Sequence, residues 1–250
     1  MRLQDLTWAA VTELSRDTPV VFPIAALEQH GRHLPLFTDS LLLGEVVRRV
    51  SPHFEDRALF APLQWLGNSD HHLDFAGTLS AAPRVYLDLL AGLLENFLAH
   101  GFRRLVLLNG HGGNIVPAAQ AVFEVRQRHR TRDDLLLLAA TYWELGAGPD
   151  ASQIVQTRMG HACEWETSMM LRLEPKLVGD LRGVDPVPFG AAFEPAARGW
   201  ITRDRSIPGH IGDPREATAD KGEALFQHFS DDVSSWLDRV VAWNGRSWEG

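Results

Sequence analysis

The sequence predicts a three-layer α/β/α protein in which helices cover both faces of a mostly parallel sheet. Short apolar runs alternate with longer amphipathic segments over residues 6–143, and segments with glycine and proline separate them. This alternation is typical of parallel strands, because a helix is the usual crossover between two of them. A chain of 250 residues is also long enough to bury the core of one such domain. We therefore expect residues 1–250 to form a single domain.

The first predicted unit comprises a helix, a buried strand, a loop and a second helix. Apolar side chains at helical spacing predict a helix over residues 6–16, and the nearly continuous apolar run over residues 19–27 predicts a buried strand. The glycine and proline of the segment EQHGRHLPLFTD indicate a loop. Asp39 and Ser40 then provide a polar start for a helix through LLLGEVVRRV.

Helices and strands continue to alternate through the rest of the chain. Gly101 follows one amphipathic segment and Pro117 lies in the first turn of the next, and helix ends favour both placements. Residues 175–222 are rich in glycine, proline and charge without periodicity, which predicts loops, whereas a stripe of apolar residues after them predicts a closing helix. The predicted elements are helices over 81–100, 115–130 and 224–243 and buried strands over 103–110 and 135–143.

Composition and charge argue against several classes of partner. The chain has 32 acidic and 24 basic residues, a formal charge of −8, and no stretch that collects lysine and arginine, so we expect no nucleic-acid partner. A single cysteine, Cys163, excludes an internal disulfide and makes the cytoplasm the expected location. The amphipathic amino terminus lacks the apolar core of a secretory signal, and no apolar run approaches the roughly 20 residues of a membrane span.

Side chains that bind metals follow the predicted strands. Glu28 and His30 lie two residues apart at the end of the first strand, so an extended chain directs both to one face. Asp39 starts the next helix, where a carboxylate faces a positive helix terminus and can bridge two cations. His111 ends another strand within LNGHGGN, whose glycines allow close approach of a ligand. Because ligands of open parallel sheets gather beyond the carboxyl ends of the strands, we expect these side chains to form one site.

A further segment, GHACEWETSMML, adds His161, Glu164 and Glu166 near the start of a helix. Carboxylate and imidazole ligands suit divalent zinc, manganese or iron, and two such ions can lower the pKa of a bridging water and polarise a carbonyl oxygen. Each motif also has a purely structural interpretation: the GHGG segment as a tight turn, Asp39 as a helix N-cap, and the two glutamates as favourable charge in a first helical turn. The combination in several loops at one end of a sheet favours the metal site.

Five blocks of the sequence resemble those of the creatininase family, in the family's order. PIAALEQHGRHLPLFTD is similar to the consensus P-x-G-S-x-E-Q-H-G-P-H-L-P-x-x-T-D, and SDHHLDFAGTLS is similar to S-x-x-H-x-x-F-P-G-T. LNGHGGN resembles the histidine loop of the family, HACEWETSMM resembles H-A-G-E-x-E-T-S, and GHIGDPREATADKGE resembles a fifth block. These blocks span almost the whole chain.

The resemblance implies an α/β/α hydrolase of cyclic or linear amides, often assembled as a homo-hexamer, with two divalent cations per subunit. Zinc is the first choice for these ions, with manganese or iron as alternatives. Glu28, Asp39 and His111 are implied to hold one cation, and His30 with the bridging Asp39 the second. A metal-bridging hydroxide is implied to attack the amide carbonyl, and His161 to transfer the proton to the leaving nitrogen.

One departure from the family leaves the second cation short of a ligand. Creatinine-opening members carry a glutamate two residues after the loop histidine, where this chain has Gly113. Glu166 is our candidate for the missing carboxylate, with Glu164 as the alternative. If the helix begins before His161, Glu164 shares the face of that histidine at i+3 and Glu166 points away, so spacing favours Glu164 and resemblance favours Glu166.

The remaining expectations concern the pocket and the reaction. We expect Glu164 beside His161 among the catalytic residues. Three functions compete: hydrolysis of a small cyclic amide or formamide, cleavage of a peptide as in the creatininase-like peptidase of the mycofactocin pathway, and metal binding without catalysis. The residues expected to contact a small-molecule amide substrate are Ser69, His72, Gly112 and Trp143.

Overall fold

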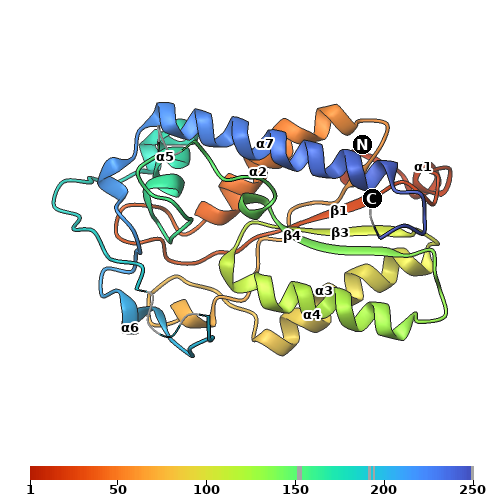
Figure 1. The fold of residues 1–250 in the computed structure, drawn as a ribbon, viewed down its shortest axis with the longest axis horizontal. Coiled ribbons are helices and arrows are strands. Elements are labelled where there is room, and N and C mark those ends of the chain that lie inside the picture. The colour runs from red at the N-terminus through yellow and green to blue at the C-terminus, as the bar shows by residue number, and fades with distance from the viewer. Residues whose placement is uncertain (151–153, 191–192, 194, 249–250) are drawn as a thin grey trace.

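The computed structural model describes residues 1–150, 154–190, 193 and 195–248, and it shows a parallel sheet between two layers of helices (Figure 1). The four strands run in the order β2-β1-β3-β4, and every neighbouring pair is parallel. Their carboxyl ends therefore lie at one edge of the sheet. The strands are β1 (Val20–Ile24), β2 (Leu59–Phe60), β3 (Arg104–Asn109) and β4 (Leu136–Thr141).

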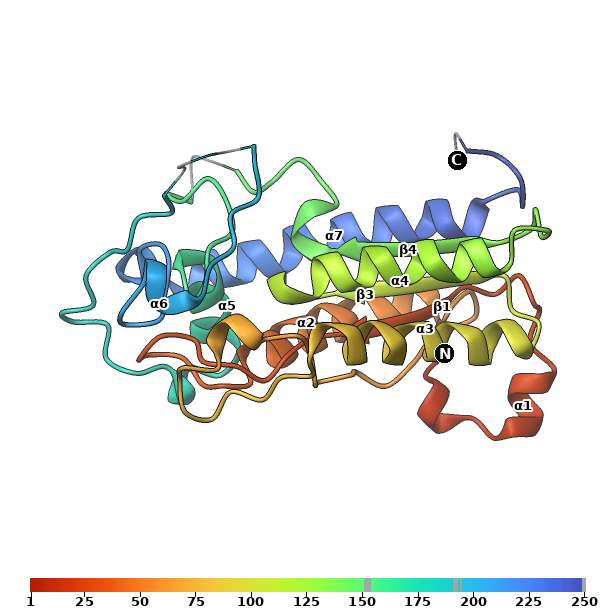
Figure 2. The same ribbon diagram turned by 90° about the horizontal axis from the view of Figure 1, so that it is seen from below.

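Helices cover both faces of the sheet, as Figures 1 and 2 show. The first layer consists of α2 (Thr38–Val50), α5 (Glu164–Leu173) and α7 (Ala219–Ala242). The second layer consists of α3 (Pro83–Ala99) and α4 (Ile115–Arg128). The structure thus confirms the predicted three-layer class with a parallel sheet.

Each strand contributes alternate side chains to two separate cores. Val21 and Val106 pack with the buried residues of α2, α5 and α7, whereas Val20 and Leu105 pack with those of α3 and α4. Successive side chains of a strand point to opposite faces, so a sheet covered on both sides needs the continuous apolar runs that the sequence contains.

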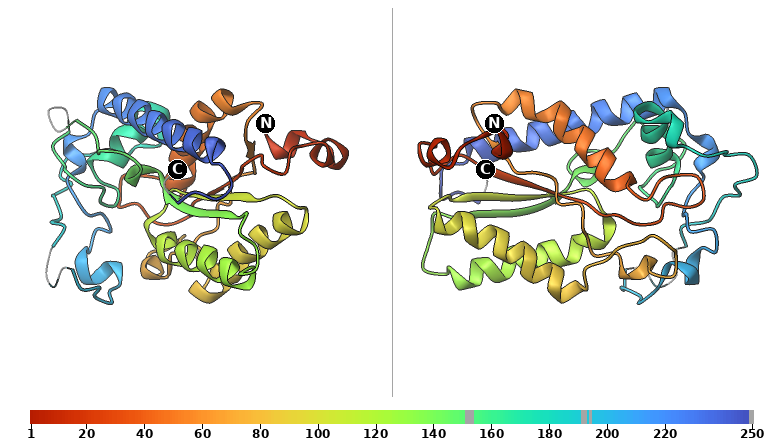
Figure 3. Two further views of the ribbon diagram at one scale, coloured as in Figure 1. Left: turned by 45° about the vertical axis from the view of Figure 1, so that its right-hand side comes forward. Right: turned by 180° about the vertical axis from the view of Figure 1, so that it is seen from behind.

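The loops at the carboxyl edge are long, and one of them carries a short helix. Figure 3, seen from behind, places α5, α6 (Thr202–Arg205) and the connections around them at the end of the sheet opposite the two chain termini. Among the described residues, no helix is long and apolar enough to cross a membrane.

Several elements differ from their predicted extent. The first helix, α1 (Trp8–Thr12), is much shorter than residues 6–16, because none of its residues is buried and Trp8 is 83% exposed. The two-residue strand β2 was not predicted, since two residues are too few to show a period. The helix α6 lies within the segment predicted as loops, and α7 begins five residues before its predicted start because Thr218 caps it by accepting a hydrogen bond from the Lys221 amide.

Candidate functional site

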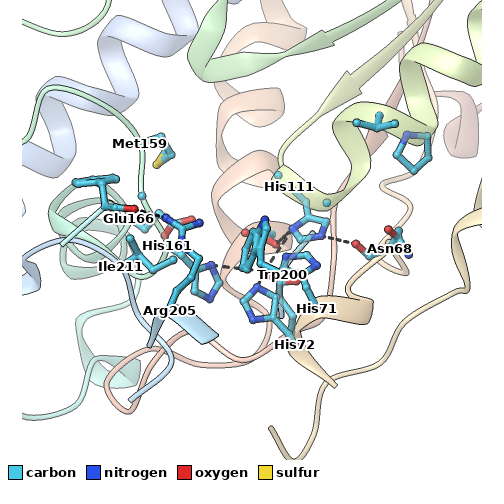
Figure 4. A pocket seen from close by; sticks show the side chains of 18 of the residues that line it. Asn68, His71, His72, His111, Met159, His161, Glu166, Trp200, Arg205 and Ile211 are labelled. Carbon is cyan, nitrogen blue, oxygen red and sulfur yellow. Dashed lines mark hydrogen bonds and ion pairs between the residues drawn. The ribbon is translucent and has the colours of Figure 1, made fainter. Parts of the chain in front are cut away.

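Acidic and imidazole side chains from two loops and two helix starts meet at the carboxyl edge of the sheet. Glu28 and His30 follow β1, and His111 follows β3. Asp39 and Glu166 lie in the first turns of α2 and α5. All five are buried, and Figure 4 shows His111, His161 and Glu166 around one hollow. The structure therefore brings together the five residues that were expected to bind metal.

Asp39 joins the two halves of this cluster. Its Oδ1 lies 3.1 Å from His30 Nε2, and its Oδ2 lies 3.0 Å from His111 Nδ1. On one side, Glu28 Oε1 lies 3.4 Å from His111 Nδ1, and on the other, Glu166 Oε1 lies 3.6 Å from His30 Nε2. One carboxylate thus serves two adjacent groups of ligand atoms.

The donor set fits divalent cations. Among the residues that the structure describes, three groups of possible ligand atoms have all their atoms within 4.8 Å of one another. One group contains Glu28, His71 and His111, and another contains His30, Asp39 and Glu166. Within the described part of the chain, no lysine or arginine pairs with these three carboxylates, and Glu28 Oε2 is buried without a hydrogen-bond partner. Buried carboxylates without such partners are costly unless a cation compensates them.

Hydrogen bonds fix which ring nitrogen of each histidine faces the cluster. His30 Nδ1 lies 3.1 Å from the Glu28 carbonyl oxygen and His111 Nε2 lies 2.9 Å from the Asn68 carbonyl oxygen, so each of these nitrogens carries the proton and donates. The opposite nitrogens, His30 Nε2 and His111 Nδ1, are therefore the ones that could bind a metal ion. Partners of this kind orient metal-binding histidines.

The electrostatics of the metal-free cluster are those of interlocked ion pairs. Burial by itself lowers the pKa of His111, but the negative charges of Glu28 and Asp39 outweigh it and raise that pKa to about 9. Burial also opposes the charge on His30, yet Asp39 raises its pKa well above the ordinary value. Conversely, His30 and His111 hold the pKa of Asp39 far below its usual range against the effect of burial. In the absence of cations, protons on His30 and His111 offset part of the charge of the three carboxylates.

His161 faces the cluster from a short bridge with the loop that follows α6. Its Nε2 lies 2.7 Å from the Gln29 carbonyl oxygen, to which it donates, and its Nδ1 lies 3.6 Å from Glu28 Oε1. Burial, together with the charge of His30, keeps the pKa of His161 well below its ordinary value. Its Nδ1 is therefore free of a proton and able to accept one.

Gln29 organises two histidines and has no counterpart among the predicted site residues. Its side-chain amide donates to the Gly209 carbonyl oxygen at 2.8 Å and to His72 Nδ1 at 2.7 Å. The hydroxyl of Thr202 also lies 2.8 Å from His72 Nδ1, so this nitrogen accepts and the proton of His72 sits on Nε2, 3.2 Å from Glu28 Oε1. Gln29 stands between two predicted ligands in the EQHG segment, and this position was the signal available in the sequence.

Glu164 does not reach the cluster, contrary to its expected catalytic role. Its carboxylate accepts hydrogen bonds from the amides of Val155 and Gln156 at 3.1 and 2.6 Å, and it pairs with Lys221 Nζ at 2.6 Å. The spacing argument for Glu164 assumed a helix that includes His161, but α5 begins at Glu164 itself.

Glu166 turns toward the cluster because the chain reverses just before α5. Ala162 has a φ of +47°, in the left-handed region, and its amide donates to Glu166 Oε2. This bond leaves Oε1 facing His30. The first turn of the helix thus separates the two glutamates into different surroundings.

A cavity of about 600 Å³ opens above the cluster. His72, Gly112 and Trp143 line it, as expected for contacts with a substrate, whereas Ser69 does not. Ser69 is fully buried, and its hydroxyl lies 3.3 Å from His111 Nε2, so it contacts a ligand side chain instead of the cavity. Residues in the cavity wall that had no predicted role include Met159, Phe189, Arg198, Trp200, Arg205 and Ile211.

The histidine loop has no room for the glutamate that creatinine-opening members carry. A Cβ atom at Gly113 would collide with the carbonyl oxygen of Asn68 and the ring of His111. Cys163 is buried without lining the cavity, and burial raises the pKa of its thiol to about 11, which does not suit a nucleophile.

The fold and the cluster together define a three-layer α/β/α protein with a carboxylate and imidazole site at the carboxyl edge of its sheet. The family model described as "Creatininase: Creatinine amidohydrolase" matches residues 4–237. The chain belongs to the creatininase family of hydrolases.

Similar proteins and structures agree with this assignment. The mycofactocin precursor peptide peptidase of Mycolicibacterium smegmatis is 33% identical over 230 residues, which cover 90% of this chain and 85% of that protein. The creatinine amidohydrolase of Pseudomonas putida is 28% identical over 89% of this chain and 90% of its own length. A mutant creatininase complexed with creatine has a TM-score of 0.81 at 27% identity, and the match covers 95% of this chain and 97% of that one. Zn-Zn and Mn forms of creatininase, at 27% and 26% identity and with the same coverage, have TM-scores of 0.79 and 0.76.

Proposed function

We propose that this protein is a metal-dependent hydrolase of a C–N amide bond. The observation that carries the proposal is Asp39, whose two oxygens face two adjacent groups of ligand atoms at the floor of an open cavity. Glu28 and His111 would hold one divalent cation, His30 and Glu166 the other, and Asp39 would bind both. Such a pair of cations supplies a water of lowered pKa and polarises a carbonyl oxygen. Zinc is our first candidate, with manganese and iron as alternatives.

The protein's own residues would position the amide and move protons. Three carboxylates would balance most of the charge of two divalent ions. The buried site could therefore hold both ions without a large net charge. His161 Nδ1, with its proton on Nε2 fixed by Gln29, accepts a proton from the attacking water and delivers it to the leaving nitrogen. The products are then a carboxylic acid and an amine, which balances the addition of one water to the amide.

A short peptide is the substrate class that we favour over a small cyclic amide. The cavity of about 600 Å³ is large for a ring of a few atoms, and Gly113 replaces the glutamate of creatinine-opening members. Relatives named as mycofactocin precursor peptide peptidases are 31–33% identical to this chain, compared with 28% for the creatinine amidohydrolase. Homo-oligomeric assembly, a cytoplasmic location and a single-domain organisation stay predictions.

The test is hydrolysis of a panel of amides by protein loaded with zinc, manganese or iron. The panel contains creatinine, N-formyl amines and short peptides, and each reaction is followed by release of the amine. We expect peptide hydrolysis that a chelator abolishes and that added metal restores. Protein that holds metal but hydrolyses no member of the panel would support metal binding without catalysis.

A further inference from the structure

Charges of opposite sign line the cavity at different depths. Glu28, Asp39 and Glu166 are buried at its floor, whereas Arg198 and Arg205 are exposed residues of its wall. The carboxylates at the floor suit cations, whereas the guanidinium groups nearer the solvent suit an anionic group. Neither arginine had a predicted role, because both lie in the segment without periodicity that precedes the fifth motif block.

Arg205 contacts Trp200, which in turn contacts a histidine of the cluster. Its Cζ lies 4.7 Å from the centroid of the Trp200 ring, and the Trp200 ring lies 5.1 Å from that of His71. His71 in turn belongs to the ligand-atom group that contains Glu28 and His111. Figure 4 shows Trp200 and Arg205 beside the histidines of the site. A molecule whose amide sits on the cluster can therefore reach the guanidinium along the face of the indole.

Most of the hydrogen-bonding capacity of Arg205 is left for a ligand. Within the part of the chain that the structure describes, its one hydrogen bond is from Nη2 to the Phe189 carbonyl oxygen at 2.5 Å, and no acidic side chain pairs with it. A guanidinium has five N–H donors, and the contact of Arg205 with the Trp200 ring helps to hold it in place. Arg158 Cζ lies 4.7 Å from the centroid of the Phe189 ring, but Arg158 does not itself line the cavity.

We propose that the substrate carries an anionic group, held by Arg205 with Arg198 at the mouth of the cavity while its amide lies on the cluster below. This inference rests on the proposed amide hydrolysis and narrows it to N-acyl amino acids or short peptides with a free terminal carboxylate. A planar guanidinium binds carboxylates with two parallel hydrogen bonds, and it binds phosphate groups in the same way. Trp200 then forms an apolar surface between the arginines at the mouth of the cavity and the carboxylates at its floor.

The first test compares pairs of substrates that differ only in charge. A short peptide from the hydrolysed panel and its C-terminal amide are assayed with wild-type protein and with Arg205→Gln, Arg198→Gln and Arg203→Gln. Arg203 is the matched control, since it lies on the same short helix, donates to the Asp74 carbonyl oxygen and does not line the cavity. We expect kcat/KM for the free acid to fall at least tenfold in Arg205→Gln, with little change for the C-terminal amide or in the control. An equal loss for both substrates would overturn the inference.

A second test measures binding without turnover and so separates this inference from the proposed function. Saturation-transfer NMR on metal-free protein compares N-acetylalanine, its methylamide and O-phosphoserine, because carboxylates then have no metal to bind. Binding of N-acetylalanine that Arg205→Gln removes and Arg203→Gln keeps would support the carboxylate. Binding of O-phosphoserine alone would overturn it in favour of a phosphate, and binding that no arginine variant changes would overturn the anion site. Charge-dependent binding by a protein that hydrolyses no amide would refute the proposed function alone.

Discussion

Exchange of the two glutamates of α5 for glutamine distinguishes the proposed metal ligand Glu166 from Glu164, which belongs to a structural ion pair. In Glu164→Gln, the charged hydrogen bond from Lys221 is lost and two backbone amides keep a weaker acceptor. Because Glu164 is 1% exposed and Lys221 is 19% exposed, we expect a loss of about 2 to 3 kcal/mol in the free energy of unfolding. For a chain of this size, that loss lowers Tm by roughly 4 to 12 °C. Metal content should stay at two per chain.

Glu166→Gln should have the opposite result. The amide oxygen of glutamine still accepts the hydrogen bond from Ala162, so the metal-free protein should change by less than about 1 kcal/mol. The carboxylate that faces His30 is gone, and metal content should fall from two to one. Elemental analysis after reconstitution with zinc and dialysis, paired with thermal unfolding of the metal-free proteins, measures both quantities. The reasoning is refuted if Glu164→Gln loses a metal while Glu166→Gln keeps two.

Three further predictions concern the rest of the cluster. Asp39→Asn should lose both metals, since this carboxylate faces both ligand groups, and two metals retained in elemental analysis would contradict its bridging role. Metal binding at pH 7 should release protons, because the pKa of His111 is raised to about 9 and that of His30 is also raised; calorimetry in two buffers of different ionisation enthalpy measures the release, and none would be evidence against these ligands. The same protons stabilise the metal-free protein fully below the unfolded pKa of about 6.5, and that contribution is lost as the pH rises through about 9. His161→Gln should keep both metals and lower kcat by about 10² to 10⁴, and a variant with unchanged kcat would exclude proton transfer by this residue.

The fold and the cluster of ligands were accessible from the sequence because both depend on local patterns. Apolar runs predict strands buried on both faces, and the end of a parallel strand predicts where its next side chains gather. Glu28 and His111 are 83 residues apart in the chain yet lie 3.4 Å apart, since β1 and β3 are neighbours in the sheet.

The parts that were not predicted depend on single backbone conformations and on irregular loops. Whether Glu164 or Glu166 faces the cluster is decided by the left-handed conformation of Ala162 and by the residue at which α5 begins, and neither is encoded in a period. Trp200 and Arg205 reach the cavity from a segment held by tertiary contacts, such as the bond between Thr202 and His72. Periodic patterns in the sequence do not predict tertiary contacts of this kind.

The order of the strands also has a consequence for how the protein folds. The four strands come from residues up to Thr141, whereas Glu166 belongs to α5, which packs against α2 and α7. A nascent chain that has not yet made α5 would therefore contain all four strands but lack the carboxylate that we propose for the second cation.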